Sequence, residues 1–307
     1  MRGRPCRRPA QQEHLITDFK RFIAKAWNDH ADNAEAAAAQ LDDAALALAT
    51  EPGDVAELSR LAFHLHGAHL ARWAEGIAWQ QRVAAMRVTG SVDAADQATV
   101  QRHIAALSLA GRAGDPRAGL DASDVIWATA LAAGSLAPHD STGAGELFHD
   151  ALARFEAAGL PGTAACVRAL AVTGNNLAAE LEERPSRNDT ERELLIQAAQ
   201  TARRCWALAG GWMEIERAEY RLAKTWLKAG DAERARLHAE ACLALVKAHG
   251  DVPLEHFSGL EVQLLAARAL GETSAAQNSA ETMRRVFAEL SPDDQRWCRA
   301  TLDKLAP

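Results

Sequence analysis

The sequence is poor in the residues that build β-sheets. Its 307 residues include a single Tyr and only 5% aromatic residues, and it has no run of the β-branched and aromatic residues that strands favour. Alanine is instead the dominant residue. It has the highest helix propensity because it loses no side-chain entropy on folding, and its small size lets helices pack closely. This composition excludes a sheet-based fold and predicts an all-α protein.

Long apolar runs are also missing. No segment reaches the roughly 18 apolar residues that a membrane-spanning helix needs. The basic start of the chain is followed by residues 11–17, which are too polar for the hydrophobic region of a secretory signal. We therefore expect a cytoplasmic protein with no membrane partner.

Cysteine pairs of the C-x-x-C type do not occur. Their absence argues against a zinc ribbon or a thioredoxin-like redox site. The five cysteines are Cys6, Cys166, Cys205, Cys242 and Cys298. Several fall at small-residue positions of predicted helices, so we expect reduced, buried thiols.

An excess of positive charge is lacking as well. The net charge is −7 and the sequence pI is near 5.9, whereas non-specific nucleic-acid binding needs a basic surface. The exception is residues 1–12, which carry Arg2, Arg4, Arg7 and Arg8. We interpret this segment as a disordered basic N-terminal arm. Contact with nucleic acid through the arm is the alternative.

Helical periodicity with clear breaks recurs from residue 116 to residue 290. The predicted helix pairs are 122–137 with 145–158, 162–183 with 189–208, 212–229 with 232–249, and 254–270 with 273–290. The break at Gly230–Asp231 is only two residues long, so the helices of that pair must be antiparallel neighbours. Residues 291–307 are predicted to form a capping helix, with Ser291 as its N-cap.

A Leu-Ala pair marks the first helix of each predicted unit. The pairs are Leu131–Ala132, Leu177–Ala178, Leu222–Ala223 and Leu265–Ala266, and their separations are roughly 43 to 46 residues. A repeat at this period is typical of a solenoid, in which each helix pair buries its apolar face against its neighbours.

The N-terminal helical region, residues 13–115, is harder to divide. We expect helices at 32–50, 54–71, 73–90 and 93–111. Two registers stay open. Either the segment from Phe63 to Gly76 forms the turn of one repeat, or the helix at 73–90 pairs with the one at 93–111. Residues 111–119, rich in Gly, Asp, Pro and Arg, are the candidate hinge between the two halves.

The repeat region resembles the tetratricopeptide repeat (TPR) family. The residues that carry the resemblance are Leu222, Ala223, Trp226, Gly230, Asp231, Ala235 and Cys242, with a looser match at Leu131, Ala132, Ala144, Phe148 and Ala151. Residues 175–178 (Asn-Asn-Leu-Ala) look like a run common in kinesin-light-chain-like repeats. The resemblance covers about residues 120–290, although the repeat spacing departs from the family's usual 34. It implies a right-handed superhelical α-solenoid of stacked antiparallel helix pairs, whose concave face binds a protein or peptide.

The resemblance also implies where a peptide would bind. Some family members hold a terminal carboxylate with an Asn before the Leu-Ala pair of one repeat and basic residues one and five positions before the pair of the next. Asn176, Arg221 and Arg217 stand at those positions, but Thr129 and Ala133 replace the Lys and Asn of a complete clamp. Arginine suits bidentate carboxylate recognition. The predicted groove for an acidic peptide comprises Asn175, Asn176, Arg217, Arg221 and Lys224. The alternative is that its arginines pair with Glu214, Glu216 or Glu219.

A histidine cluster in the N-terminal half is the other candidate site. On an α-helix His66 and His69, three residues apart, would reach one ion, while His64 would point elsewhere. The zincin spacing of two His four apart with an intervening Glu is missing. We interpret these histidines as structural, and a metal-dependent domain or enzyme centred on them is the alternative.

Motifs of catalysis are otherwise lacking. Residues 142–145 have neither the glycine spacing nor the Lys-Ser/Thr of a phosphate-binding loop, and no Gly-x-Ser-x-Gly elbow occurs. Six tryptophans are predicted to fill gaps between Ala-rich helices: Trp73, Trp79, Trp127, Trp206, Trp212 and Trp226. The sequence thus predicts a binding scaffold with no cofactor and no enzymatic activity.

Overall fold

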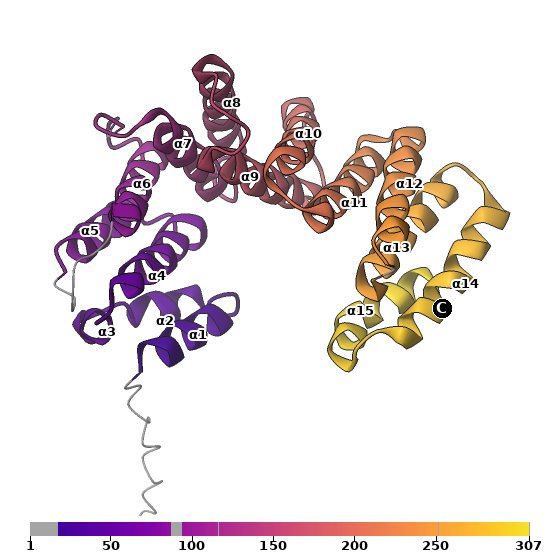
Figure 1. Cartoon of the computed structure of the whole chain (residues 1–307), viewed down its shortest axis with the longest axis horizontal. Coiled ribbons are helices and arrows are strands. Elements are labelled where there is room, and N and C mark those ends of the chain that lie inside the picture. Colours follow the sequence, from indigo (N-terminus) through magenta and orange to yellow (C-terminus); the bar gives the residue numbers. More distant parts are fainter. Residues whose placement is uncertain (1–17, 87–93, 116, 251, 307) are drawn as a thin grey trace, which may run out of the picture.

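The protein is all-helical. The structure, a computed structural model, describes residues 18–86, 94–115, 117–250 and 252–306. These residues form fifteen α-helices and one π-helical turn and contain no strand. The helices follow one another along an open arch, with α1 toward one end and α14 and α15 at the other (Figure 1). The predicted all-α class is therefore confirmed, whereas the predicted N-terminal arm, with Cys6, lies outside the described residues.

The four predicted C-terminal helix pairs are present. They are α7 (Ala122–Leu136) with α8 (Ser141–Ala158), α9 (Ala165–Glu183) with α10 (Asp189–Ala209), α11 (Trp212–Ala229) with α12 (Ala232–Ala248), and α13 (Pro253–Ala269) with α14 (Thr273–Glu289). The two helices of each pair contact each other, and each first helix also contacts the next one along the chain, from α7 to α9, α11 and α13. In Figure 1, α8 and α10 lie on the outer side of the arch.

Short turns separate the helices of these pairs. Gly230 and Gly271 have φ values of 85° and 75°, a left-handed conformation that only Gly adopts without strain. Directly after the first of these glycines, the side chain of Asp231 accepts a hydrogen bond from the Arg234 backbone N at 2.9 Å and caps α12.

The N-terminal half departs from the prediction. Its elements are α1 (Phe19–Asp29), α2 (Ala34–Ala39), α3 (Asp43–Leu48), α4 (Pro52–Phe63), the π-helical turn η1 (His64–His69), α5 (Trp73–Ala84) and α6 (Ala94–Ala110). The predicted helix 32–50 is divided into α2 and α3. The cause is Asp42, the N-cap residue of α3, whose side chain accepts a hydrogen bond from Ala45 N. Helix α1 was not predicted. Helices α5 and α6 contact each other, as the second register predicts, but α6 also packs on α4 and α7.

The core consists mainly of alanine and leucine. A central cluster of buried residues extends from Phe63 to Ala266, and separate clusters lie at the two ends of the chain. The four described cysteines are free and buried, as predicted. Trp79, Trp206 and Trp226 are buried.

Helices α9 and α10 approach each other unusually closely. A Cβ atom placed on Gly174 would lie 2.6 Å from the backbone O of Ala198, closer than real atoms come. By contrast, a Cβ atom on Gly134 would meet its nearest neighbour, a methyl group of Thr173, at an ordinary 3.6 Å. Packing thus requires glycine at position 174 and does not require it at position 134.

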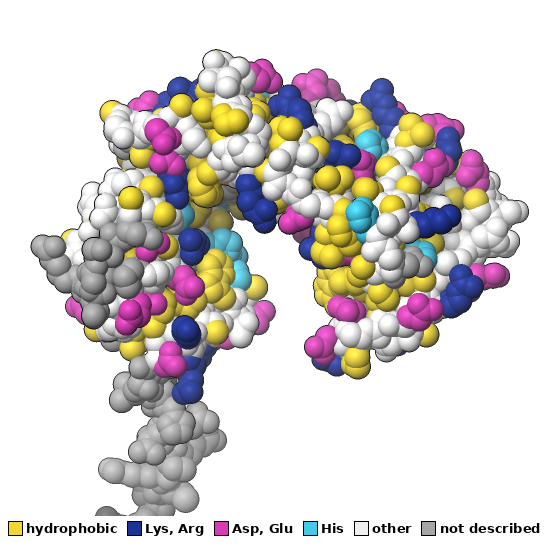
Figure 2. Space-filling view, in the orientation of Figure 1, with side chains coloured by type: hydrophobic (Ala, Val, Ile, Leu, Met, Phe, Trp, Pro, Cys, Tyr) yellow, Lys and Arg dark blue, Asp and Glu magenta, His cyan; other side chains and the backbone are white. Residues whose placement is uncertain are grey.

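Charged side chains of both signs are interspersed among neutral and hydrophobic ones over the face in view (Figure 2). None of the helices in the described ranges combines the length and the apolar character that crossing a membrane requires.

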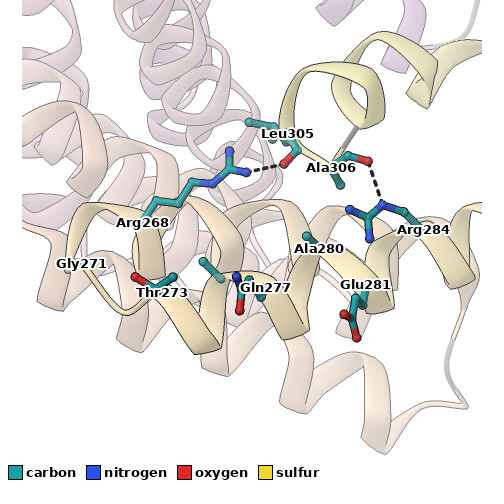
Figure 3. A pocket seen from close by; sticks show the side chains of 10 residues that line it. Arg268, Gly271, Thr273, Gln277, Ala280, Glu281, Arg284, Leu305 and Ala306 are labelled. Atoms are coloured by element: carbon teal, nitrogen blue, oxygen red, sulfur yellow. Dashed lines mark hydrogen bonds between the residues drawn. The ribbon is translucent and has the colours of Figure 1, made fainter.

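The C-terminal helix α15 (Pro292–Leu305) closes the stack. Its N-cap is Ser291, as predicted, whose hydroxyl accepts from Asp294 N at 3.2 Å. At its other end, Arg268 Nη2 donates to the Leu305 carbonyl at 2.5 Å, and Arg284 Nε donates to the Ala306 carbonyl at 3.1 Å (Figure 3). These bonds satisfy carbonyls that the helix end leaves without an intrahelical donor.

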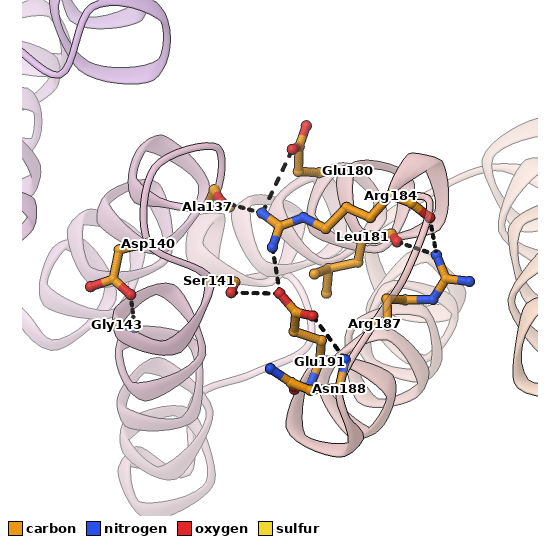
Figure 4. A network of polar contacts seen from close by, with 10 residues as sticks. All are labelled: Ala137, Asp140, Ser141, Gly143, Glu180, Leu181, Arg184, Arg187, Asn188 and Glu191. Atoms are coloured by element: carbon orange, nitrogen blue, oxygen red, sulfur yellow. Dashed lines mark hydrogen bonds and ion pairs between the residues drawn. The ribbon is translucent and has the colours of Figure 1, made fainter.

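A polar network holds the loop between α9 and α10 (Figure 4). Glu191 accepts hydrogen bonds from Arg184 Nη1 at 2.5 Å, Ser141 Oγ at 2.9 Å and Asn188 N at 3.0 Å. Arg184 also donates to the Ala137 carbonyl at 2.9 Å. The network therefore joins α8 to the α9–α10 loop and fixes the orientation of the helix pair.

Candidate functional site

A cavity of about 530 Å³ lies between α11, α13 and α15, with Asn175 of α9 at its edge. Four of the five residues of the predicted groove line it: Asn175, Arg217, Arg221 and Lys224. The fifth, Asn176, is exposed and is not part of the lining. Consecutive residues of a helix point about 100° apart, so the two asparagines cannot both face the cavity.

The three cations share one face of α11. Arg217, Arg221 and Lys224 are separated by four and three residues, the spacing that aligns side chains along a helix. On the opposite face of α11, Leu222 and Ala223 are buried in the core. The packing of α11 therefore turns its cationic face toward the cavity.

Glu182, on the last turn of α9, neutralises two of these cations. Its Oε2 accepts from Arg221 Nη1 at 2.7 Å and its Oε1 lies 3.1 Å from Lys224 Nζ. Only 3% of Glu182 is exposed. A carboxylate buried this deeply is stable only when it is paired, so Glu182 fixes the positions of both cations.

Arg217 is the most accessible cation of the cavity. It donates from Nη2 to Glu255 Oε1 at 2.5 Å and from Nε at 3.1 Å, yet 58% of its side chain is exposed. The acidic partners predicted from helical spacing were wrong here, because the hydrogen-bonded carboxylates of Arg217 and Arg221 come from the neighbouring helices α13 and α9. The predicted partner Glu219 instead accepts from Arg203 and contacts His238.

A fully buried carboxyl group, that of Glu216, also lies in the lining of the cavity, beside Arg217. Glu216 is fully buried, and burial raises its pKa to about 7. The Cys242 thiol donates to its Oε1 at 2.6 Å, while Oε2 has no hydrogen-bond partner. The Glu216 carboxyl group therefore gains or loses its proton close to neutral pH.

A half-buried polar pair, Tyr220 with Glu261, also lines the cavity. Tyr220 donates its hydroxyl to Glu261 Oε2 at 3.1 Å. Burial raises the pKa of both groups. Glu261 thus carries its negative charge less readily than an exposed glutamate does.

Trp297 stands at the rim of the cavity. It lines the cavity from α15, and 73% of it is exposed. An adjoining cavity of about 410 Å³ shares Lys224, Glu261 and Thr301 with the first. We call the two together the groove; it extends along α11, α13 and α15.

The groove carries charged side chains of both signs. Its cations are matched by nearby carboxylates, so it offers hydrogen-bonding groups of both signs rather than a strong field. Cys298, which lines the groove, is buried, and burial raises its pKa to about 11. Its thiol is therefore not the thiolate that nucleophilic catalysis needs.

The predicted histidine pair is rearranged. His69 Nε2 lies 3.0 Å from His64 Nε2, whereas His66 is buried and neither of its ring nitrogens has a hydrogen-bond partner. The cause is the π-helical turn, which brings residues five apart together where an α-helix would align residues three or four apart. Burial, with the nearby His69 and His30, lowers the pKa of His64 to about 4.

A further cavity of about 540 Å³ lies between α13, α14 and the end of α15. Two of its lining residues, Arg268 and Arg284, already donate to carbonyls at the end of α15 (Figure 3). We assign this cavity to the packing of the terminal helix.

Comparison with known proteins adds no assignment: no protein-family model matches this chain, and no curated protein matches it.

Proposed function

We propose that this protein is a peptide-binding scaffold that holds a segment of a partner protein in the groove between α11, α13 and α15. The observation that carries the proposal is the convergence of side chains from α9, α11 and α13, each the first helix of its pair, on one cavity with an exposed tryptophan at its rim. Exposed aromatic anchors beside hydrogen-bonding groups are typical of sites that bind proteins.

The architecture that we propose for the protein is a TPR-like, right-handed superhelix. The contacts between successive first helices support it, as do the left-handed Gly230 and the Asp231 cap at the turn that carried the family resemblance. A preformed concave face loses little conformational entropy on binding, which favours affinity.

The charges of the groove define the ligand further. Glu182 offsets Arg221 and Lys224, and Glu255 offsets Arg217. Because Arg217 has the most exposed side chain of the three, it is the cation that an acidic group of the ligand reaches. Asn175 presents an amide that can bond a peptide backbone. We therefore propose a peptide with a single acidic group, held beside a residue that packs on Trp297, rather than a strongly acidic tract.

The proposed compartment is the cytoplasm. The four described cysteines are free thiols, which is the state that a reducing compartment maintains.

A random peptide library displayed on phage and selected on the full chain tests the proposal. Peptides enriched on the wild type are expected to carry an aromatic or aliphatic residue near an Asp, a Glu or a free C-terminus. They should bind the Trp297→Ala variant about tenfold or more weakly, since a tryptophan anchor contributes a large share of an interface.

The matched control is Leu237→Ala on α12. Leu237 is 57% exposed and does not line the groove, so its truncation should leave binding unchanged. Peptides that bind both variants as they bind the wild type would refute the groove as the binding site.

A further inference from the structure

Three histidines from two separate segments meet in the N-terminal half of the structure. His30 is the C-cap residue of α1, and His64 and His69 are the first and last residues of η1. One ring nitrogen of each lies within 4.8 Å of the others. Figure 2 shows histidine side chains at the surface of this half, toward the opening of the arch.

The π-helical turn creates the pair of imidazoles. On an α-helix, residues five apart are separated by about 140° around the axis. The backbone of η1 is instead bonded from Leu70 N to Leu65 O at 3.1 Å, an i to i+5 bond, which places His69 one turn above His64. Turns of this kind are frequent at functional sites.

The third imidazole is oriented by the backbone. His30 Nδ1 lies 2.6 Å from the Trp27 carbonyl. A carbonyl only accepts, so Nδ1 carries the proton and Nε2 keeps its lone pair. A hydrogen bond of this kind orients the histidine ligands of metal sites.

We propose that His30, His64 and His69 form a binding site for a divalent transition-metal ion of the Zn²⁺ class. Tetrahedral Zn²⁺ with nitrogen ligands at 2.0–2.1 Å requires the nitrogens to be about 3.3 Å apart. The His64–His69 separation of 3.0 Å is close to this value, and small ring rotations bring in His30.

The ligand set selects the metal. Three imidazoles and no carboxylate suit Zn²⁺, Co²⁺, Ni²⁺ or Cu²⁺, whereas Mg²⁺ and Ca²⁺ require oxygen ligands. His69 is exposed, so the ion is reached from solvent and keeps a coordination position for water or for a side chain of a partner. The ion joins α1 to the end of α4 and thereby fastens the first helix of the arch.

Isothermal titration of the chelator-treated full chain with ZnCl₂ tests the site. The wild type should bind one ion per chain, and MgCl₂ should give no binding. His69→Ala should weaken Zn²⁺ binding by about 100-fold or more, since changes even to the residues that support metal ligands cost 10–100-fold. Because His69 is exposed, this variant is expected to fold. His69→Gln, which preserves side-chain size, is the second variant.

The matched control is His149→Ala, which removes an exposed histidine of α8 away from the cluster. It should bind Zn²⁺ as the wild type does. Visible absorption of the Co²⁺-loaded protein provides a second readout, and the bands of a low-symmetry site should be present in the wild type and lost in His69→Ala. A wild type without a stoichiometric ion, or equal affinities in the wild type and both His69 variants, would overturn the proposal.

Discussion

Replacing Glu216 by glutamine should change the stability of the protein in a way that depends on pH. Glu216 is fully buried, and burial raises its pKa from 4.5 to about 7. One of its oxygens accepts the Cys242 thiol and the other has no partner. The folded state therefore favours the protonated carboxyl, which glutamine imitates in shape and in charge.

The sign follows from proton binding. Between pH 4.5 and about 7 the folded state binds a proton at Glu216 that the unfolded state has released, so stability falls as the pH rises through this range. The raised pKa corresponds to about 3 kcal/mol. The glutamine variant does not undergo this loss. Relative to the wild type it should gain about 3 kcal/mol between pH 4.5 and pH 8.

Urea unfolding followed by far-UV circular dichroism at several pH values measures the effect. The difference in unfolding free energy between Glu216→Gln and wild type should shift in favour of the variant as the pH rises. A difference independent of pH would refute the reasoning. It would mean that Glu216 is hydrated or paired with a cation.

Glu219, three residues further on the same helix, is the matched control. Burial alone would raise its pKa, but hydrogen bonds from His238 and Arg203 lower it below its usual value. Its contribution to stability is therefore present above the unfolded pKa and is lost as the pH falls. Glu219→Gln should accordingly cost the same stability at every pH above its usual pKa of 4.5 and less below it, so it should not show the rise between pH 4.5 and pH 8 that is expected of Glu216→Gln.

Two further substitutions test the groove and the packing of the first helices. Glu182→Gln should lower the unfolding free energy by roughly 2–4 kcal/mol because it leaves Arg221 and Lys224 without their buried counter-charge. The same substitution should strengthen the binding of an acidic peptide. An unchanged unfolding free energy in urea would contradict the pairing. Gly174→Ala should lower the unfolding free energy by roughly 1–3 kcal/mol because it forces α9 and α10 apart. Gly134→Ala should instead raise it by up to about 1 kcal/mol. Equal melting temperatures of these two variants would contradict the close contact of α9 and α10.

Much of the C-terminal half could be predicted because its signals are local. A glycine with positive φ at Gly230 and the capping residues Asp231 and Ser291 mark helix ends within a few residues of sequence. The cationic face of α11 was also predictable, because helical spacing alone aligns its side chains.

The failures concern contacts between segments far apart in the chain. Glu182 is 39 residues from Arg221, and Glu255 is 38 from Arg217, so no helical periodicity reveals these pairs. The meeting of His64 and His69 depends on a π-helical turn, whereas α-helical spacing aligns residues three or four apart. Trp297 lines the groove although the sequence predicts only a capping role for α15.

The central claim is that the groove binds a peptide through Arg217. Calorimetric titration of a library-selected peptide into the wild type, Arg217→Ala and Arg236→Ala at pH 7 tests it most directly. Arg236 lies on α12 and pairs with Glu233 and Glu240 outside the groove. We expect Arg217→Ala to bind the peptide more weakly by roughly 1–3 kcal/mol and Arg236→Ala to bind it as the wild type does. Equal affinities in all three proteins would contradict it.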